Sequence, residues 1–294
     1  MEVLPFLFAP FVASLILTGI HAYLGVHVVE RGVIFVDLAL AQIAALGATV
    51  AILAGMDPHG GSSYWISLGF TFLGAAMFSL FRVRKAHIPQ EAFIGIAYAV
   101  ASAAAILAMS KATGETEHLK DMLVGNILTV SWNEVGRTAL LYGAIGLFHY
   151  IFRKNFLLIS IHPEQAEAQG ISIRLWDFLF YASFGFVVTS SVAIAGVLLV
   201  FCYLIVPSVA AMLFAEKIGR RLAIGWTMGT LVSALGVYLS VFLDLPTGAT
   251  IVCTFGLVLG VMFVIHLLLY HGNRHRGVEE GHEGVAVSAE DRAR

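Results

Sequence analysis

The chain has 294 residues, of which 59% are hydrophobic and 12% are charged, and its formal net charge is −2. The charged fraction is about half the soluble average of roughly 25%, which excludes an ordinary soluble domain. The slightly negative charge argues against nucleic acid as a partner. Both cysteines, Cys202 and Cys253, lie in apolar runs, so no disulfide framework is expected. The composition therefore indicates an all-α protein that lies mostly within a membrane.

Nine apolar segments follow one another along the chain, and a helix of about 20 apolar residues crosses a bilayer core. The run from Trp176 to Ala215 carries one charge, Asp177, and is long enough for two such helices. We therefore expect a polytopic transmembrane helix bundle of about nine spans. The predicted spans are residues 5–26, 33–54, 64–82, 92–110, 133–153, 176–191, 194–215, 221–243 and 248–270.

The basic residues predict the orientation of these spans. Of the 17 lysines and arginines, all except Lys111, Lys120 and Arg137 fall in alternate loops on one side. The positive-inside rule places that side in the cytoplasm, with the N-terminus outside and the C-terminus inside. The N-terminal segment has no basic region ahead of its apolar run, so it is expected to be a first span and not a cleaved signal peptide.

The chain divides into a predicted membrane domain, residues 1–270, and a tail, residues 271–294. The tail is polar and rich in glycine and has no apolar period, which is typical of a disordered segment. We expect it to lie in the cytoplasm. Its histidines follow no fixed spacing and are not expected to form a metal site.

The largest predicted cytoplasmic loop covers about residues 154–175 and contains the signals of a short helix. Pro163 can open that helix, Glu164 and Glu167 favour its first turns, and Gly170 can end it. A short acidic helix held between two spans is the form expected of a docking surface for a soluble partner.

Four motifs in this order resemble those of a known family. They are A-x-x-x-G at Ala166 and Gly170, G-V-L-L-V at 196–200, L-I-V-P-x-x-A-A at 204–211 and D-x-P-T-G-x-x-I-V at 244–252. The order resembles that of the permease subunits of the zinc, manganese and iron ABC importers, over nearly the whole chain to about residue 270. The resemblance implies one half of a homodimeric pore of the vitamin-B12-importer type in the inner (plasma) membrane, embedded in lipid.

The resemblance also implies partners and site residues. The partners are a cytoplasmic ABC ATPase and an extracytoplasmic metal-binding protein, and the cargo is a divalent metal ion with no permanently bound cofactor. Residues 162–175 become a coupling helix in a cleft of the ATPase, and two further residues become gating positions or helix breaks. The coupling residues are Glu164, Ala166, Glu167 and Gly170, and the breaks are Gly196 and Pro207. The chain has no G-x-x-x-x-G-K-[ST] motif, so ATP hydrolysis is expected on a separate chain.

Ionisable side chains within spans are functional candidates because burying them in a membrane is costly. Asp37 in the second span and His21 in the first are the candidates for the transport pathway. His149 and His266, near the ends of the fifth and ninth spans, are expected to be structural residues at the interface.

The second span departs from the family pattern, which has an aspartate and a histidine four residues apart and a glycine five residues later. Aligning on Gly47 places Gln42 at the histidine position and Leu38 at the aspartate position. Asp37 is one residue earlier, so it is turned by about 100° around the helix from the family's aspartate position. Carboxylate and amide oxygens favour harder ions, manganese or iron, over zinc. We therefore expect the pathway to pass Asp37 and Gln42, with His21 contributing.

Two alternatives come from other classes. One is a secondary carrier or channel that uses Asp37 as a proton or cation relay without an ATPase. The other is an intramembrane enzyme, which the sequence disfavours because it has neither H-E-x-x-H nor G-x-S-x-G.

Overall fold

The computed structural model describes residues 3–57, 60–81, 89–110 and 127–291, and all of the regular secondary structure in these ranges is helical. The predicted loop residues Arg82, Arg84, Lys85, Lys111 and Lys120 lie outside the described residues. The helices are α1 (Val3–Arg31), α2 (Val36–Leu53), α3 (Gly61–Leu80), α4 (Gln90–Met109), η1 (Ile127–Thr129), α6 (Trp132–Ile151), α7 (Arg153–Ile161), α8 (Pro163–Ala168), α9 (Ile173–Ala195), α10 (Val197–Phe214), α11 (Ile218–Phe242) and α12 (Thr247–Asp291).

The helices match the predicted spans in number and order. Eight of them are long and apolar enough to cross a membrane. The fifth predicted span, residues 133–153, corresponds to α6, which forms with α7 a pair of helices bent by 74° at Phe152. The prediction of an all-α, polytopic bundle of about nine spans is therefore confirmed, whereas the orientation of its termini stays a prediction.

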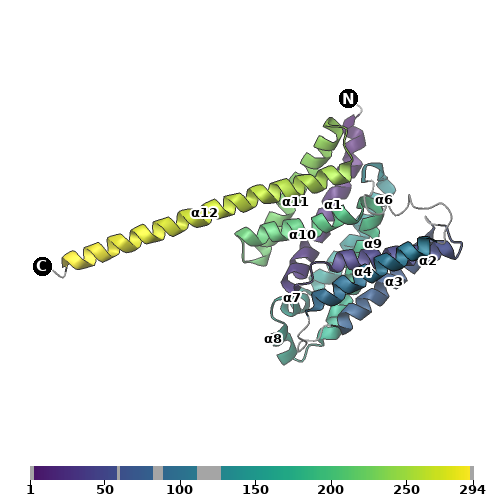
Figure 1. The fold of residues 1–294 in the computed structure, drawn as a ribbon, viewed down its shortest axis with the longest axis horizontal. Helices are drawn as coiled ribbons and strands as arrows, with labels where there is room; N and C mark the ends of the chain where they lie inside the picture. The colour runs from purple at the N-terminus through teal and green to yellow at the C-terminus, as the bar shows by residue number, and fades with distance from the viewer. Residues whose placement is uncertain (1–2, 58–59, 82–88, 111–126, 292–294) are drawn as a thin grey trace.

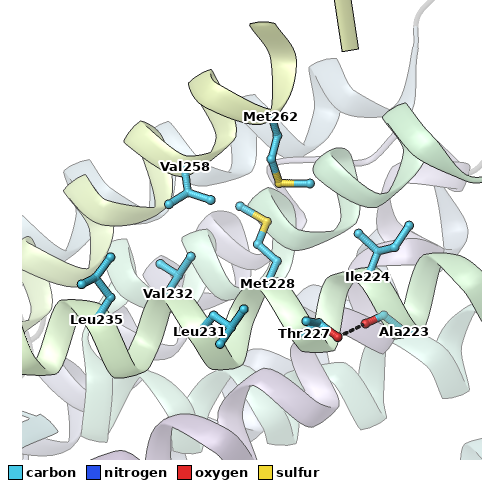
Figure 2. A pocket seen from close by; sticks show the side chains of 9 residues that line it. All are labelled: Ala223, Ile224, Thr227, Met228, Leu231, Val232, Leu235, Val258 and Met262. Atoms are coloured by element: carbon cyan, nitrogen blue, oxygen red, sulfur yellow. Dashed lines mark hydrogen bonds between the residues drawn. The ribbon is translucent and has the colours of Figure 1, made fainter. Parts of the chain in front are cut away.

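The helices pack in two groups (Figure 1). The first group is α2, α3, α4 and α9, and the second is α1, α10, α11 and α12; α6 and α7 contact members of both. The chain passes from one group to the other between α1 and α2 and again between α9 and α10. Each of these connections contains a glycine with positive φ, Gly32 at 66° and Gly196 at 76°, a conformation that glycine adopts without steric cost.

Close packing within the second group depends on small residues. A Cβ on Gly25 of α1 would lie 1.9 Å from the Leu204 carbonyl oxygen of α10. A Cβ on Gly229 of α11 would lie 2.4 Å from Cγ2 of Thr18 of α1. Such contacts bring backbones together where no hydrophobic force drives helix association. A Cβ on Gly256 or Gly260 of α12, by contrast, would meet no atom within 4 Å, so this face of α12 is open.

The last helix extends beyond the bundle (Figure 1). Its apolar part runs from Thr247 to Leu269, and Leu257 and Leu268 are more than two-thirds exposed. The backbone stays helical to Asp291, so α12 continues through most of the segment that the sequence predicts to be disordered. That segment contains no proline, so nothing in it forces the helix to stop.

Candidate functional site

Asp37 lies in the first turn of α2 and is only 2% exposed. Its Oδ1 is buried and has no hydrogen-bond partner among the described residues. Glu91, in the first turn of α4, lies close enough to interact with it electrostatically. Glu91 Oε1 accepts a hydrogen bond from the Phe35 backbone N–H (3.0 Å), and its Oε2 is also buried, with no hydrogen-bond partner in the part of the chain that the structure describes. The N-terminal ends of α2 and α4 therefore hold two carboxyl groups, each with an unsatisfied oxygen.

Gln42 lies on a different side of α2 from Asp37. Five residues along a helix correspond to a rotation of about 140°. Asp37 lies on the buried side of the helix, whereas Leu38 and Gln42 are both partly exposed. The structure therefore does not bring the Asp37 carboxyl and the Gln42 amide onto one face. The sequence prediction missed Glu91 because the predicted span started one residue later.

His21 belongs to a separate polar network between α1, α6 and α9. Its Nδ1 bonds the Leu17 carbonyl oxygen (2.8 Å), and its Nε2 bonds Ser191 Oγ (3.2 Å). The Tyr142 hydroxyl hydrogen-bonds Ser191 as well. Each of these hydrogen bonds of the His21 ring is thus to α1 or α9, and the structure does not group His21 with Asp37.

A second polar network lies at the end of α1. Arg31 and Asp177 form an ion pair (2.7 Å) whose side chains are 1% and 0% exposed. The Arg31 guanidinium lies 4.0 Å from the centre of the Phe180 ring, and its Nε donates to Ser160 Oγ of α7 (2.9 Å). His149 of α6 is 1% exposed and stacks on the Phe156 ring, so its imidazole is buried within the bundle, whereas its depth in the membrane stays a prediction.

The helix α8 has a well-defined C-terminal cap. The Ile171 N–H donates to the Ala166 carbonyl (3.0 Å) and the Gly170 N–H to the Glu167 carbonyl (2.9 Å), which is the Schellman pattern. Gly170 has φ of 74°. Ala166 is buried, whereas Glu164 and Glu167 are exposed. This arrangement anchors α8 through Ala166 and presents its acidic side chains outward.

The sequence predicts a helix break at Gly196 and another at Pro207. Gly196 separates α9 from α10, and Pro207 lies inside α10, where it removes one backbone donor. At the next residue, Ser208 Oγ hydrogen-bonds the carbonyls of Leu204 (2.9 Å) and Ala22 (3.3 Å). A gating role for either break stays a prediction.

A helical bundle of eight or nine candidate spans, with ionisable side chains in its interior and a capped acidic helix between two spans, is typical of a membrane transport subunit. The particular family follows from its sequence: residues 3–268 match the model of the ABC 3 transport family, and the chain belongs to that family. The chain is therefore the permease of an ABC transporter, a multi-pass membrane protein, and ATP hydrolysis belongs to a separate subunit.

Relatives with sequence similarity agree with this assignment, and a solved structure shares the fold. The chain is 26% identical to the manganese transport system membrane protein MntC of Listeria innocua, over 90% of each chain. It is 28% identical to a probable iron transport system membrane protein of Haemophilus influenzae, over 86% of this chain and 90% of that protein. PsaBC from Streptococcus pneumoniae, solved in complex with Fab, has the same fold, with a TM-score of 0.73, 23% identity and coverage of 88% and 91%.

Proposed function

We propose that this permease imports a divalent transition-metal ion, manganese or iron in preference to zinc, across the inner membrane. The observation that carries the proposal is the buried carboxyl group of Asp37, whose Oδ1 has no hydrogen-bond partner among the described residues, in a chain whose relatives are named for manganese and iron transport. Carboxylate oxygens suit these harder ions. Among the described residues, no three His, Cys, Asp or Glu side chains lie together in a way that could hold a metal. Binding at Asp37 is therefore weak, as release of a transported ion requires.

The active assembly in this proposal is a homodimer with two ATPase subunits and an extracytoplasmic metal-binding protein. Helices α4 and α12 expose apolar side chains along much of their length, and lipid and a second copy would cover them. α8 docks on the ATPase through Glu164 and Glu167.

ATP-dependent uptake tests the proposal. Cells that express the chain with its genomic neighbours should accumulate radioactive manganese or iron, and the permease should co-purify with a nucleotide-binding subunit. A matched strain with an ATPase that binds but does not hydrolyse ATP is the control. Uptake that persists in the control strain would support the alternative of a secondary carrier that uses Asp37 as a relay.

Replacing Gly170 with valine should uncouple ATP hydrolysis from transport. A β-branched residue at φ of 74° is strained by roughly 1–3 kcal/mol, so the α8 cap would rearrange. No atom lies within 4 Å of a Cβ at this position, so the effect comes from the backbone. Gly170→Asn is the matched control, because asparagine tolerates positive φ. Normal uptake and normal stimulation of the ATPase in Gly170→Val would remove α8 as the coupling element.

The proposed orientation has the N-terminus outside and the C-terminus in the cytoplasm. In a background without Cys202 and Cys253, single cysteines at Ser62 and Gln169, both exposed, should react with an impermeant maleimide from opposite sides of the membrane. Labelling of Ser62→Cys in intact cells and of Gln169→Cys only after permeabilisation is the expected result. Labelling of both positions in intact cells would show that the orientation is wrong.

A further inference from the structure

Three aromatic side chains meet near the end of α1. They are Tyr23 and His27 of α1 and His149 of α6. The ring centroids are 4.8 Å apart for Tyr23 and His27, 5.5 Å for Tyr23 and His149, and 6.5 Å for His27 and His149, and each pair is edge-on. His27 and His149 are each 1% exposed. Tyr23 Oη, His27 Nε2 and His149 Nδ1 are buried, and none of them has a hydrogen-bond partner among the described residues. We refer to these three residues as the imidazole–phenol cluster.

The bonds of His27 determine what its unpaired nitrogen can do. His27 Nδ1 lies 2.9 Å from Ser160 Oγ, and Ser160 Oγ donates its one proton to the Phe156 carbonyl (2.8 Å). Nδ1 must therefore be the donor to Ser160. In the neutral imidazole, the remaining nitrogen, Nε2, then carries a lone pair and no proton.

The same reasoning applies to His149 with the two ring nitrogens exchanged. His149 Nε2 lies 2.8 Å from Ser183 Oγ, which donates to the Phe180 carbonyl (2.9 Å). Nε2 is therefore the donor, and Nδ1 carries the free lone pair. Histidine ligands of metals characteristically donate their other ring N–H to an oxygen that fixes the tautomer, as the two serines do here.

We propose that His27, His149 and Tyr23 form a transit site for a divalent transition-metal ion inside the single protomer. With metal–nitrogen bonds of about 2.0–2.1 Å, two imidazoles that share an ion have ring centroids roughly 5–6 Å apart. The observed 6.5 Å is longer than this range, so the two rings would move closer together when they share an ion. The phenol of Tyr23 supplies an oxygen donor. Imidazole ligands select transition metals over calcium or magnesium.

The charge around the cluster permits a cation. Arg31 lies nearby, but its buried ion pair with Asp177 balances its charge. The two imidazoles and the phenol carry no formal charge themselves, so the site binds weakly and releases its ion, as a transit site must. The role of the cluster in transport rests on the proposed function, whereas binding of the ion does not.

Cobalt(II) absorbance of the purified transporter tests this site directly. The full chain with its ATPase, in lipid nanodiscs and purified without a histidine tag, is titrated with Co²⁺. The background carries Asp37→Asn and replaces the histidines of residues 271–294 with asparagine, which removes competing ligands. We expect ligand-field absorption that saturates at about one Co²⁺ per chain, and His27→Gln or His149→Gln should weaken affinity by about 10–100-fold.

Two milder variants keep the test decisive if those variants fold poorly. Tyr23→Phe keeps the ring and removes an oxygen that has no hydrogen-bond partner among the described residues. Ser183→Ala removes only the hydroxyl that orients His149. Both variants should weaken Co²⁺ binding. His266→Gln, on α12 against Phe214, is the matched control and should leave it unchanged. Equal affinity in the parent, Tyr23→Phe, Ser183→Ala and His266→Gln would overturn the proposal. Cobalt binding without metal uptake by the unsubstituted transporter would instead contradict the proposed function alone.

Discussion

Replacing Asp177 with alanine is expected to destabilise the folded permease by about 3–5 kcal/mol. The mutation removes the carboxylate that lies 2.7 Å from the Arg31 guanidinium, while that guanidinium stays almost completely buried. A lost partner in a buried ion pair costs much more than the pair contributes relative to apolar residues, because a buried charge remains. Thermal denaturation in detergent, followed by size-exclusion chromatography, measures the effect.

Two controls identify the cause of this loss. Glu30→Ala breaks a second ion pair of α1, the one between Glu30 and Arg221. The Arg221 and Glu30 side chains are 13% and 21% exposed, so this substitution should lower the stability by only about 1 kcal/mol. The double variant Arg31→Met with Asp177→Leu removes both charges and should recover most of the stability. If Asp177→Ala is no less stable than Glu30→Ala, the ion pair does not tie α1 to α9.

Replacing Asp37 with asparagine is expected to lower metal uptake at least about tenfold, equivalent to about 1.4 kcal/mol. Asparagine has the same shape but lacks the charge that would attract a cation. Because Asp37 Oδ1 has no hydrogen-bond partner among the described residues, the change should leave expression and folding intact. Uptake of radioactive manganese per assembled transporter is the measurement.

Further variants separate the carboxyl group from its surroundings. Glu91→Gln should reduce uptake less, since Glu91 is partly exposed and also caps α2 through Phe35. Gln42→His restores an imidazole at the family position and should shift preference towards zinc. Normal uptake by Asp37→Asn would make Asp37 a structural residue and leave the choice of cargo without support.

The sequence predicted the spans well because apolar length is a strong signal in membranes, where every backbone polar group must be satisfied within a helix. The break at Gly196 and the short helix ended by Gly170 were predicted for a related reason: few residues fit those backbone positions. The 74° bend at Phe152 was not predicted, because neither proline nor glycine marks it.

The polar interior was harder to predict, because its residues come together only through tertiary packing. His27 lies one residue beyond the predicted end of the first span, and Glu91 lies one residue before the fourth. The contact between Arg31 and Asp177 spans 146 positions in the sequence, which no local pattern reports. His21 and Asp37 are ionisable residues in neighbouring spans, yet the structure gives His21 its partner on α9, far along the chain.

The two glycines that connect the helix groups, Gly32 and Gly196, have a consequence for how the sequence can vary. At these two connections the positive φ sets the direction in which the chain enters the next group of helices. A saturation library selected for transport should therefore retain glycine, or asparagine as the next best residue, at both positions, although a Cβ on Gly32 would meet no atom within 4 Å.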